Sequence, residues 1–204
     1  MGKIITFAQQ KGGAGKTTLL AGLAHALVLK GKSVAAADLD PQGSLRTWAS
    51  LGGIEKLQMI ETASYRVGGD LRSAKAAHDF VLVDCPGSAT PLLEAAIRES
   101  DCVIVPCQAS QVDVWATQAV LDMCAAENTP CRVVLNRVPP RGKAADETRR
   151  SLAAAGAKVM KAQVGNRVAF ANGLASGSTV LGLPGQARAK DELAAFTKEV
   201  LKAL

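Results

Sequence analysis

A glycine-rich segment near the N-terminus has the residue types and spacing that bind phosphate. Gln9 to Thr18 reads QQKGGAGKTT, between an apolar run at Ile4 to Ala8 and a helix-like run that begins at Thr17. A strand, a glycine loop and a helix in this order are the setting of a phosphate-binding loop. Glycines let successive backbone N–H groups turn toward phosphate oxygens, and the N-terminus of the helix adds partial positive charge.

The loop also supplies side chains for a nucleotide and its metal ion. Lys16 can reach the β- and γ-phosphates as a point charge, and the Thr17 hydroxyl can ligate Mg²⁺. The alternative is a glycine-rich turn beside a surface lysine, and the agreement of motif and context argues against it. We therefore predict that a nucleotide and Mg²⁺ bind here, in contact with Gly12, Gly13, Ala14, Gly15, Lys16, Thr17 and Thr18.

The loop departs from the ordinary pattern at two positions. Gln10 stands where a glycine is usual, six residues before the second lysine, and Lys11 follows at once. The run from Lys11 to Thr18 resembles the signature K-G-G-x-G-K-S/T-T of the ParA/MinD family of deviant-Walker ATPases. The resemblance implies ATP and ADP as ligands and an ATP-dependent homodimer, in which Lys11 reaches the phosphates bound by the other subunit and joins Lys16 in catalysis. On the residues alone, Lys11 would be a solvated loop lysine.

Two further segments end in carboxylates. Asp84 closes an apolar run of the Walker B type, and a carboxylate at the end of a parallel strand can hold a Mg²⁺-bound water. Asp38 to Gly43 resembles the D-x-D-P-Q-G element of the same family. This implies that Asp40 orients the attacking water and that Asp38 is a second candidate on the metal side. Each aspartate alone could be a helix cap or a turn residue, but their order along the chain favours the nucleotide site.

A later strand is predicted to contribute to base binding. In the family an asparagine at the position of Asn136 contacts the adenine, and Arg137 could stack on the base; the alternative for Asn136 is a turn-initiating residue. The stretch Val105 to Asp113 resembles a family segment that lies at the dimer interface. Asp113 could instead serve only as a helix-start residue.

Length and composition predict one domain, residues 1–204. The chain has 204 residues, of which 48% are apolar and 3% are aromatic, enough to bury one core. No apolar run reaches the ~18 residues of a membrane-spanning helix, and a strand begins too early for a signal peptide. We therefore expect a cytoplasmic protein. Five cysteines without C-x-x-C spacing predict reduced thiols in the core and argue against a metal cluster.

The charge is uneven along the chain. The formal net charge is +6, and from Arg132 to Arg167 nine Lys and Arg face two acidic residues, a local excess of nine minus two, or +7. Such a run is usually a solvated face, but it also suits a polyanion. DNA contacts would be to phosphates and so independent of sequence and sensitive to salt. The candidates are Arg149, Arg150, Arg167, Arg188, Lys190, Lys198 and Lys202.

Apolar strand-like runs alternate with helix-like runs throughout. This predicts an α/β fold, a mostly parallel twisted sheet with helices on both faces. Predicted strands are 3–8, 33–38, 57–61, 80–84, 101–106 and 131–136, with a short one at 157–160. Predicted helices are 17–30, 44–51, 70–77, 91–99, 112–127, 144–155, 167–175 and 186–203, and a glycine-containing loop runs through 177, 182 and 185.

Together these features predict a ParA-like ATPase of weak intrinsic activity. Its ATP dimer would bind non-specific DNA on the nucleoid and segregate or position a plasmid, a chromosome or a protein cargo. A centromere-binding or cargo adaptor protein would stimulate hydrolysis. A MinD-like membrane switch is the main alternative and needs a basic amphipathic C-terminal helix. Leu193, Phe196 and Val200 have helical spacing, but acids and lysines mix on the polar face, so we expect a docked helix and no stable membrane anchor. A metabolic P-loop enzyme and an iron–sulfur carrier lack supporting residues.

Overall fold

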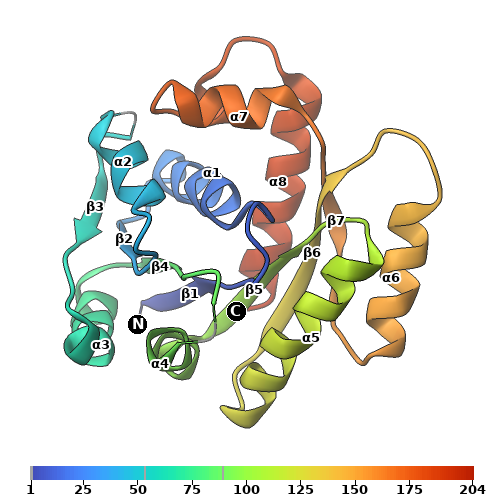
Figure 1. Cartoon of the computed structure of the whole chain (residues 1–204). Coiled ribbons are helices and arrows are strands. Elements are labelled where there is room, and N and C mark those ends of the chain that lie inside the picture. Colours follow the sequence, from blue (N-terminus) through green and yellow to red (C-terminus); the bar gives the residue numbers. More distant parts are fainter. Residues whose placement is uncertain (1, 53, 89) are drawn as a thin grey trace.

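The protein is built on one sheet of seven parallel strands. The computed structural model describes residues 2–52, 54–88 and 90–204, and Figure 1 shows the sheet running through the middle of the molecule. The strand order is β3-β2-β4-β1-β5-β6-β7, and each pairing is parallel. The central strands are buried throughout, as their continuous apolar sequences require. The strands are β1 (Lys3–Phe7), β2 (Val34–Asp38), β3 (Leu57–Ile60), β4 (Phe80–Asp84), β5 (Cys102–Cys107), β6 (Cys131–Val138) and β7 (Val159–Gly165).

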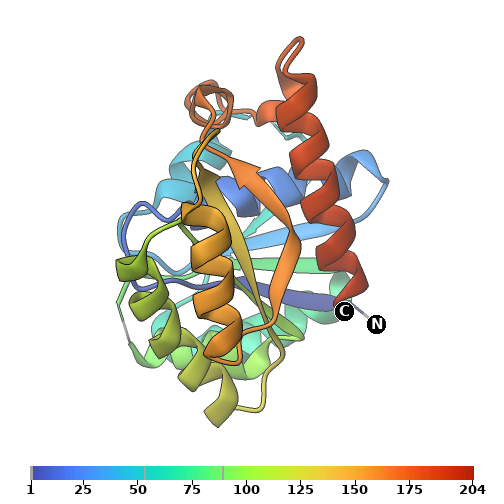
Figure 2. The same cartoon turned by 90° about the vertical axis from the view of Figure 1, so that its right-hand side faces the viewer.

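Helices cover both faces of this sheet and enclose two hydrophobic clusters (Figures 1 and 2). One face carries α1 (Lys16–Leu29), α2 (Ser44–Ser50), α7 (Val168–Ala175) and α8 (Ala187–Lys202). The other face carries α3 (Val67–Ala77), α4 (Pro91–Glu99), α5 (Gln111–Ala126) and α6 (Ala144–Ala154). The predicted fold class is therefore confirmed.

Most predicted elements lie within one or two residues of the observed ones, and two differ more. Helix α3 begins at Val67, three residues before its predicted start, after a short 3₁₀ turn at Ser64–Arg66. Gly68 and Gly69 hide this start because glycine disfavours helix. Strand β7 runs on to Gly165 and shifts register twice against β6, so its apolar pattern is broken. The predicted loop near Gly182 contains a second 3₁₀ turn, Val180–Gly182.

The C-terminal helix is part of the core. Leu193, Phe196 and Val200 of α8 are fully buried, and the rings of Phe7 and Phe196 meet edge to face with centroids 6.5 Å apart. The expectation of a docked helix is confirmed, because its apolar side faces the sheet. Among the described helices, none combines the length and the apolar composition needed to span a bilayer.

Carboxylates of α8 also occupy the outer edge of the sheet at β7. Glu199 accepts hydrogen bonds from the backbone N–H groups of Lys161 and Ala162, at 2.9 and 2.8 Å. Glu192 accepts one from Gly165 at 3.1 Å. An edge strand with free N–H groups is a template for another chain, so these carboxylates protect the edge.

Candidate functional site

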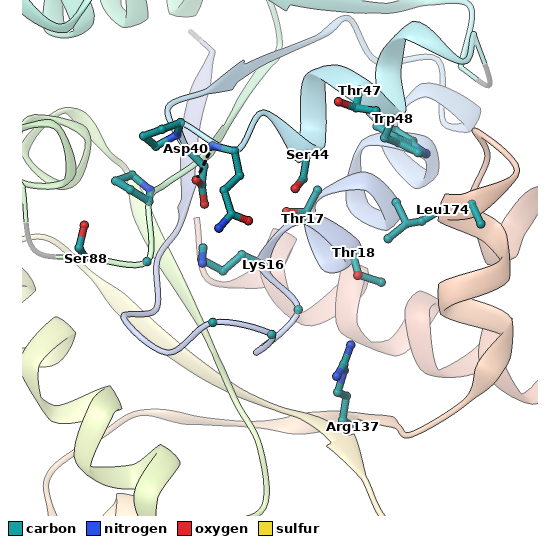
Figure 3. A pocket seen from close by; sticks show the side chains of 18 of the residues that line it. Lys16, Thr17, Thr18, Asp40, Ser44, Thr47, Trp48, Ser88, Arg137 and Leu174 are labelled. Carbon is teal, nitrogen blue, oxygen red and sulfur yellow. Dashed lines mark hydrogen bonds between the residues drawn. The ribbon is translucent and has the colours of Figure 1, made fainter.

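A cavity of about 950 Å³ lies over the glycine loop, outside the carboxyl ends of the strands (Figure 3). Ligands of open α/β sheets bind in this place, and the volume suits a nucleotide. The cavity gathers predicted residues from three separate segments: the glycine loop, Asp40 and Arg137. Its walls include Gly12, Gly13, Gly15, Lys16, Thr17, Thr18, Asp40, Gln42, Ser44, Trp48, Leu51, Gly87, Ser88, Arg137, Leu174 and Ala175.

The loop has the backbone of a phosphate cradle. Gly13 and Gly15 have left-handed φ angles of 75° and 97°, which other residues adopt only with strain. Helix α1 then begins at Lys16, and no side chain caps its first turn. The N–H groups of that turn therefore remain available to an anionic ligand.

Lys16 is buried at the floor of the cavity. Its side chain is 8% exposed, and Nζ donates a long hydrogen bond of 3.4 Å to the Gln9 carbonyl. Figure 3 shows the side chain lying along the loop and below Asp40. A lysine held by one weak bond can turn to phosphate oxygens at little cost.

Thr17 and Asp84 form a contact suited to a hard cation. The Thr17 hydroxyl donates to Asp84 Oδ2 at 2.6 Å, and Asp84 Oδ1 is buried without a hydrogen-bond partner among the described residues. Burial raises the pKa of Asp84 to about 7, although the Thr17 hydrogen bond and the charge of Lys16 lower it. A hydroxyl and an unsatisfied carboxylate oxygen fit Mg²⁺. In the described ranges no three His, Cys, Asp or Glu side chains converge on a metal site, so phosphates and waters would complete the shell.

The two aspartates of the D-x-D element differ in their surroundings. Asp38 is buried, and its carboxylate oxygens accept from the backbone N–H groups of Asp40 at 3.1 Å and Arg46 at 2.9 Å. Asp38 thus shapes the turn into α2. Asp40 is half-buried and lines the cavity, with one oxygen accepting from the N–H of Gln42 at 3.0 Å. Asp40 is therefore the aspartate of this element that faces a ligand.

Asn136 and Arg137 take different positions at the end of β6. Asn136 is 4% exposed, and its side-chain amide donates to the Ala14 carbonyl at 2.7 Å, so it holds the glycine loop. A Cβ atom on Gly15 would lie 2.2 Å from that amide nitrogen, which leaves room only for glycine. Arg137 has a φ of 52° inside a register shift of β6, and this bulge turns its side chain to the cavity wall.

Lys11 lies outside the cavity walls and is paired within its own chain. Its Nζ is 2.6 Å from Asp113 Oδ2 in the first turn of α5. The Asp113 side chain is 1% exposed, its Oδ2 also accepts from Ser110, and its Oδ1 has no described partner. The sequence alone does not indicate this pair, because 102 residues separate its members.

A buried polar network ties the loop to the same helix. Gln9 is fully buried, and its amide donates to the Pro106 carbonyl and to the Thr117 hydroxyl, both at 3.0 Å. Thr117 in turn donates to the Asp113 carbonyl at 2.8 Å. Gln108 donates to the Gly13 carbonyl at 3.1 Å. The position of α5 is therefore coupled to the loop by two direct contacts, Gln9 to Thr117 and Lys11 to Asp113.

Three of the predicted DNA-binding residues are engaged within the chain. Arg167 forms a two-pronged ion pair with Glu192, with Nε to Oε2 at 2.9 Å and Nη2 to Oε1 at 2.5 Å. Arg149 donates to the Met160 carbonyl and to the Gln163 side chain. The third, Arg188, is exposed, and its Nε lies 4.0 Å from Glu192 Oε1. Of the other candidates, Lys190 is half-buried and Arg150, Lys198 and Lys202 are exposed. Six of the seven lie on α6 or α8, which flank β7 as Figure 2 shows, and Arg167 lies in the short link between β7 and α7.

An apolar part of the cavity was not predicted. Trp48, Leu51, Leu174 and Ala175 line it opposite the loop, and Trp48 Nε1 donates to the Ser178 carbonyl at 2.7 Å. Such a wall suits a nucleobase. These residues belong to no sequence motif. The one signal that could have suggested the apolar wall is the position of Trp48 soon after the D-x-D element.

Known proteins match both the sequence and the fold. The family described as CobQ/CobB/MinD/ParA nucleotide binding domain matches residues 5–180. "Maintenance of carboxysome distribution protein A" of Halothiobacillus neapolitanus is 30% identical over 211 residues, which covers 97% of this chain and 95% of the relative. A putative plasmid partition protein of Borrelia burgdorferi B31 bound to AMPPNP superposes with a TM-score of 0.80 at 18% identity, covering 100% of both chains. MinD of Pyrococcus horikoshii OT3 with Mg-ADP gives 0.79 at 18% identity, over 98% of this chain and 96% of that one. These two structures share its fold.

Proposed function

The chain belongs to the CobQ/CobB/MinD/ParA family of P-loop ATPases, and we propose that it is a ParA-like switch that positions a cargo. In this cycle ATP assembles a homodimer, the dimer binds non-specific DNA on the nucleoid, and hydrolysis releases it. An adaptor protein on the cargo stimulates hydrolysis. The relative named for carboxysome distribution favours a large protein assembly as cargo, and a plasmid or chromosome is the second candidate.

The glycine loop would hold the triphosphate. Its backbone N–H groups and Lys16 lie at the floor of the cavity, and Trp48 and Leu174 offer apolar surface for the base. Thr17 would ligate Mg²⁺ directly, and Asp84 would hold a metal-bound water through its free oxygen. When bound, Mg²⁺ neutralises charge on the β- and γ-phosphates.

Hydrolysis would depend on positioning and charge. Asp40 orients a water that attacks the γ-phosphorus; a new O–P bond forms, the bond to the β-phosphate oxygen breaks, and ADP and phosphate leave. Lys16 of the same chain and Lys11 of the second subunit stabilise the negative charge that develops on these oxygens. With Lys11 held by Asp113, one chain alone lacks this second charge, so we expect slow hydrolysis in the monomer.

One observation supports the proposed dimer most directly: Lys11 and its neighbours face outward beside the loop. The Lys11 side chain is 37% exposed although its partner Asp113 is buried. Val112 and Trp115, on either side of Asp113 in α5, are 55% and 66% exposed. Exposed apolar residues around a shared site favour contact with a second copy. The ATP dimer would therefore bury Trp115 and bring Lys11 to the other nucleotide.

DNA binding would use the basic residues around β7 that remain free. Arg150, Lys198 and Lys202 are exposed, and none of them forms an ion pair with a described carboxylate. The ion pair of Arg167 with Glu192 makes it a weaker candidate than these three exposed residues. Two subunits neutralise twice as many DNA phosphates as one subunit. For the ATP form, log K of DNA binding should therefore fall more steeply with the logarithm of the salt concentration, with a slope of about 0.9 per phosphate contacted.

The decisive experiment measures nucleotide binding, molecular mass and retention on random-sequence duplex DNA, with ATP and with ADP. Wild type should dimerise and bind DNA with ATP alone. Lys16→Ala should lose nucleotide binding, Lys11→Ala should bind ATP as a monomer, and Asp40→Ala should accumulate as an ATP dimer that does not hydrolyse. Lys32→Ala, an exposed lysine away from the cavity, is the control for charge. Normal dimers of Lys11→Ala, or equal DNA retention in both nucleotides, would contradict the proposal.

A further inference from the structure

Two cysteines meet where α5 ends and β6 begins. After α5 the chain reverses through Asn128, which has a left-handed φ of 53°, and the N–H of Thr129 donates to the Cys124 carbonyl at 2.8 Å. Two residues later Cys131 opens β6. The turn is fixed from outside as well, because the Thr129 hydroxyl donates to the Ile97 carbonyl at 3.0 Å. Cys124 and Cys131 are therefore held as neighbours by the main chain.

The two thiols affect each other's ionisation. The neighbouring Cys131 thiol lowers the pKa of Cys124, and the Cys124 thiol together with burial raises the pKa of Cys131. A neighbour that stabilises the Cys124 thiolate favours reaction at that sulfur, because the thiolate is the reactive form of cysteine. The first proton to leave the pair is thus the one on Cys124.

A small molecule can reach the pair. Both cysteines line a surface cavity of about 380 Å³, with Gln118, Asp122 and Lys158 in the same walls. Cys124 is buried, but Cys131 is half-buried and open to this cavity. Peroxides are small and polar, and the polar side chains of the cavity suit them.

We propose that Cys124 and Cys131 form a reversible disulfide when the protein meets a peroxide. The Cys124 thiolate attacks one oxygen of the peroxide; an S–O bond forms, the O–O bond breaks, and hydroxide takes up a proton and leaves as water. Cys131 then loses its proton and attacks the Cys124 sulfur; the S–S bond forms and the sulfenic oxygen leaves as water. Two thiols lose two electrons and the peroxide gains them. A dithiol reductant reverses the reaction.

The other cysteines are protected. Cys85 is fully buried, and burial raises the pKa of its thiol. Burial also raises the pKa of Cys102 and of Cys107, in each case to about 11. Buried thiols that remain protonated react slowly with peroxide. The reaction should therefore be selective for one pair out of five cysteines.

Counting thiols in the folded protein tests this selectivity. The protein is treated with hydrogen peroxide, the excess is removed with catalase, and free thiols are alkylated after denaturation and counted by mass spectrometry. The count should fall from five to three, peptide mapping should join Cys124 to Cys131, and dithiothreitol should restore all five. Five remaining thiols, or a bridge to Cys102, would overturn the proposal.

Single variants and a second probe keep the test independent of folding defects. In Cys131→Ser, Cys124 should stop at the sulfenic acid and react with dimedone; Cys102→Ser is the matched control and should still form the bridge. Phenylarsine oxide, which joins two adjacent thiols with loss of water, should protect two thiols of the wild type without any substitution. An arsenical that protects none, or a bridge that forms equally in Cys131→Ser, would refute the pair.

Discussion

Replacing Asp113 by asparagine should strengthen ATP-dependent dimerisation. In the single chain Asp113 holds Lys11 at 2.6 Å, and Lys11 must leave this position to reach a second nucleotide. Asparagine keeps the size of the side chain and the capping position beside Ser110, but it removes the charge that attracts the lysine. The variant therefore removes the free-energy cost of releasing Lys11 from Asp113, which the wild type meets in each subunit when it dimerises.

The structure sets the size of the effect. A hydrogen bond between charged groups contributes about 1.5–3 kcal/mol when it is shielded from water. The Lys11 side chain is 37% exposed although the Asp113 side chain is 1% exposed. Solvent screening therefore reduces the stabilisation that this pair contributes to about 1 kcal/mol. Two subunits release one lysine each, which gives about 2 kcal/mol, or a dimer dissociation constant about 30-fold lower.

The measurement is sedimentation equilibrium with a non-hydrolysable ATP analogue, so that hydrolysis does not remove the dimer. Asp122→Asn is the matched control, because Asp122 is exposed on the same helix and its replacement changes the net charge equally. Asp122→Asn should dimerise like wild type. If Asp113→Asn dimerises no more tightly than this control, the pair does not restrain Lys11; if it dimerises more weakly, Asp113 itself contacts the second subunit.

Two other substitutions test the loop and the β7 edge. Gly15→Ala should lower the free energy of unfolding by at least about 1–2 kcal/mol, because φ is 97° and the new Cβ would lie 2.2 Å from Asn136. Gly12→Ala is the control, because a Cβ there meets open space, and its free energy of unfolding should stay close to that of wild type in the same urea titration. Equal losses in the two variants would refute the clash. Partial burial tends to raise the pKa of Glu192, but hydrogen bonds from Arg167 and Gly165 and nearby positive charge outweigh it, so the pKa lies below its ordinary 4.5. The ionised Glu192 therefore stabilises the fold above pH 4.5 and loses this effect as the pH falls through its lower folded value, so wild type should lose melting temperature below pH 4.5 more steeply than Glu192→Gln; parallel melting curves would contradict this.

Local patterns were sufficient for the fold and for the floor of the site. The run FVLVD predicts both strand β4 and the position of Asp84 at its end, because a buried parallel strand must be apolar throughout and its carboxyl end faces the ligand. The glycine loop likewise predicts its own backbone. Side-chain pairs between distant segments were not predictable: Lys11 with Asp113, and Arg167 with Glu192, depend on how helices sit against the sheet.

The roles inferred from family resemblance divide in the same way, between what one segment indicates and what depends on the packing of distant segments. Asp40 lines the cavity, as its position in the D-x-D element suggested, whereas the oxygens of Asp38 are taken by backbone N–H groups. Asn136 holds the glycine loop, and its predicted contact with the base stays a prediction. The bulge that aims Arg137 at the cavity follows from a register shift between two strands, which no single strand's sequence reveals.

The contacts that shape the glycine loop also determine when the loop can become functional during synthesis. Its partners Pro106, Gln108, Asp113 and Asn136 all lie about a hundred residues or more downstream. A nascent chain that ends before Pro106 contains the complete phosphate-binding motif but none of these supports. Nucleotide affinity should thus be acquired late, after β6 has joined the sheet, so that ATP recognises chains that already contain β6 and not the shorter ones that precede them.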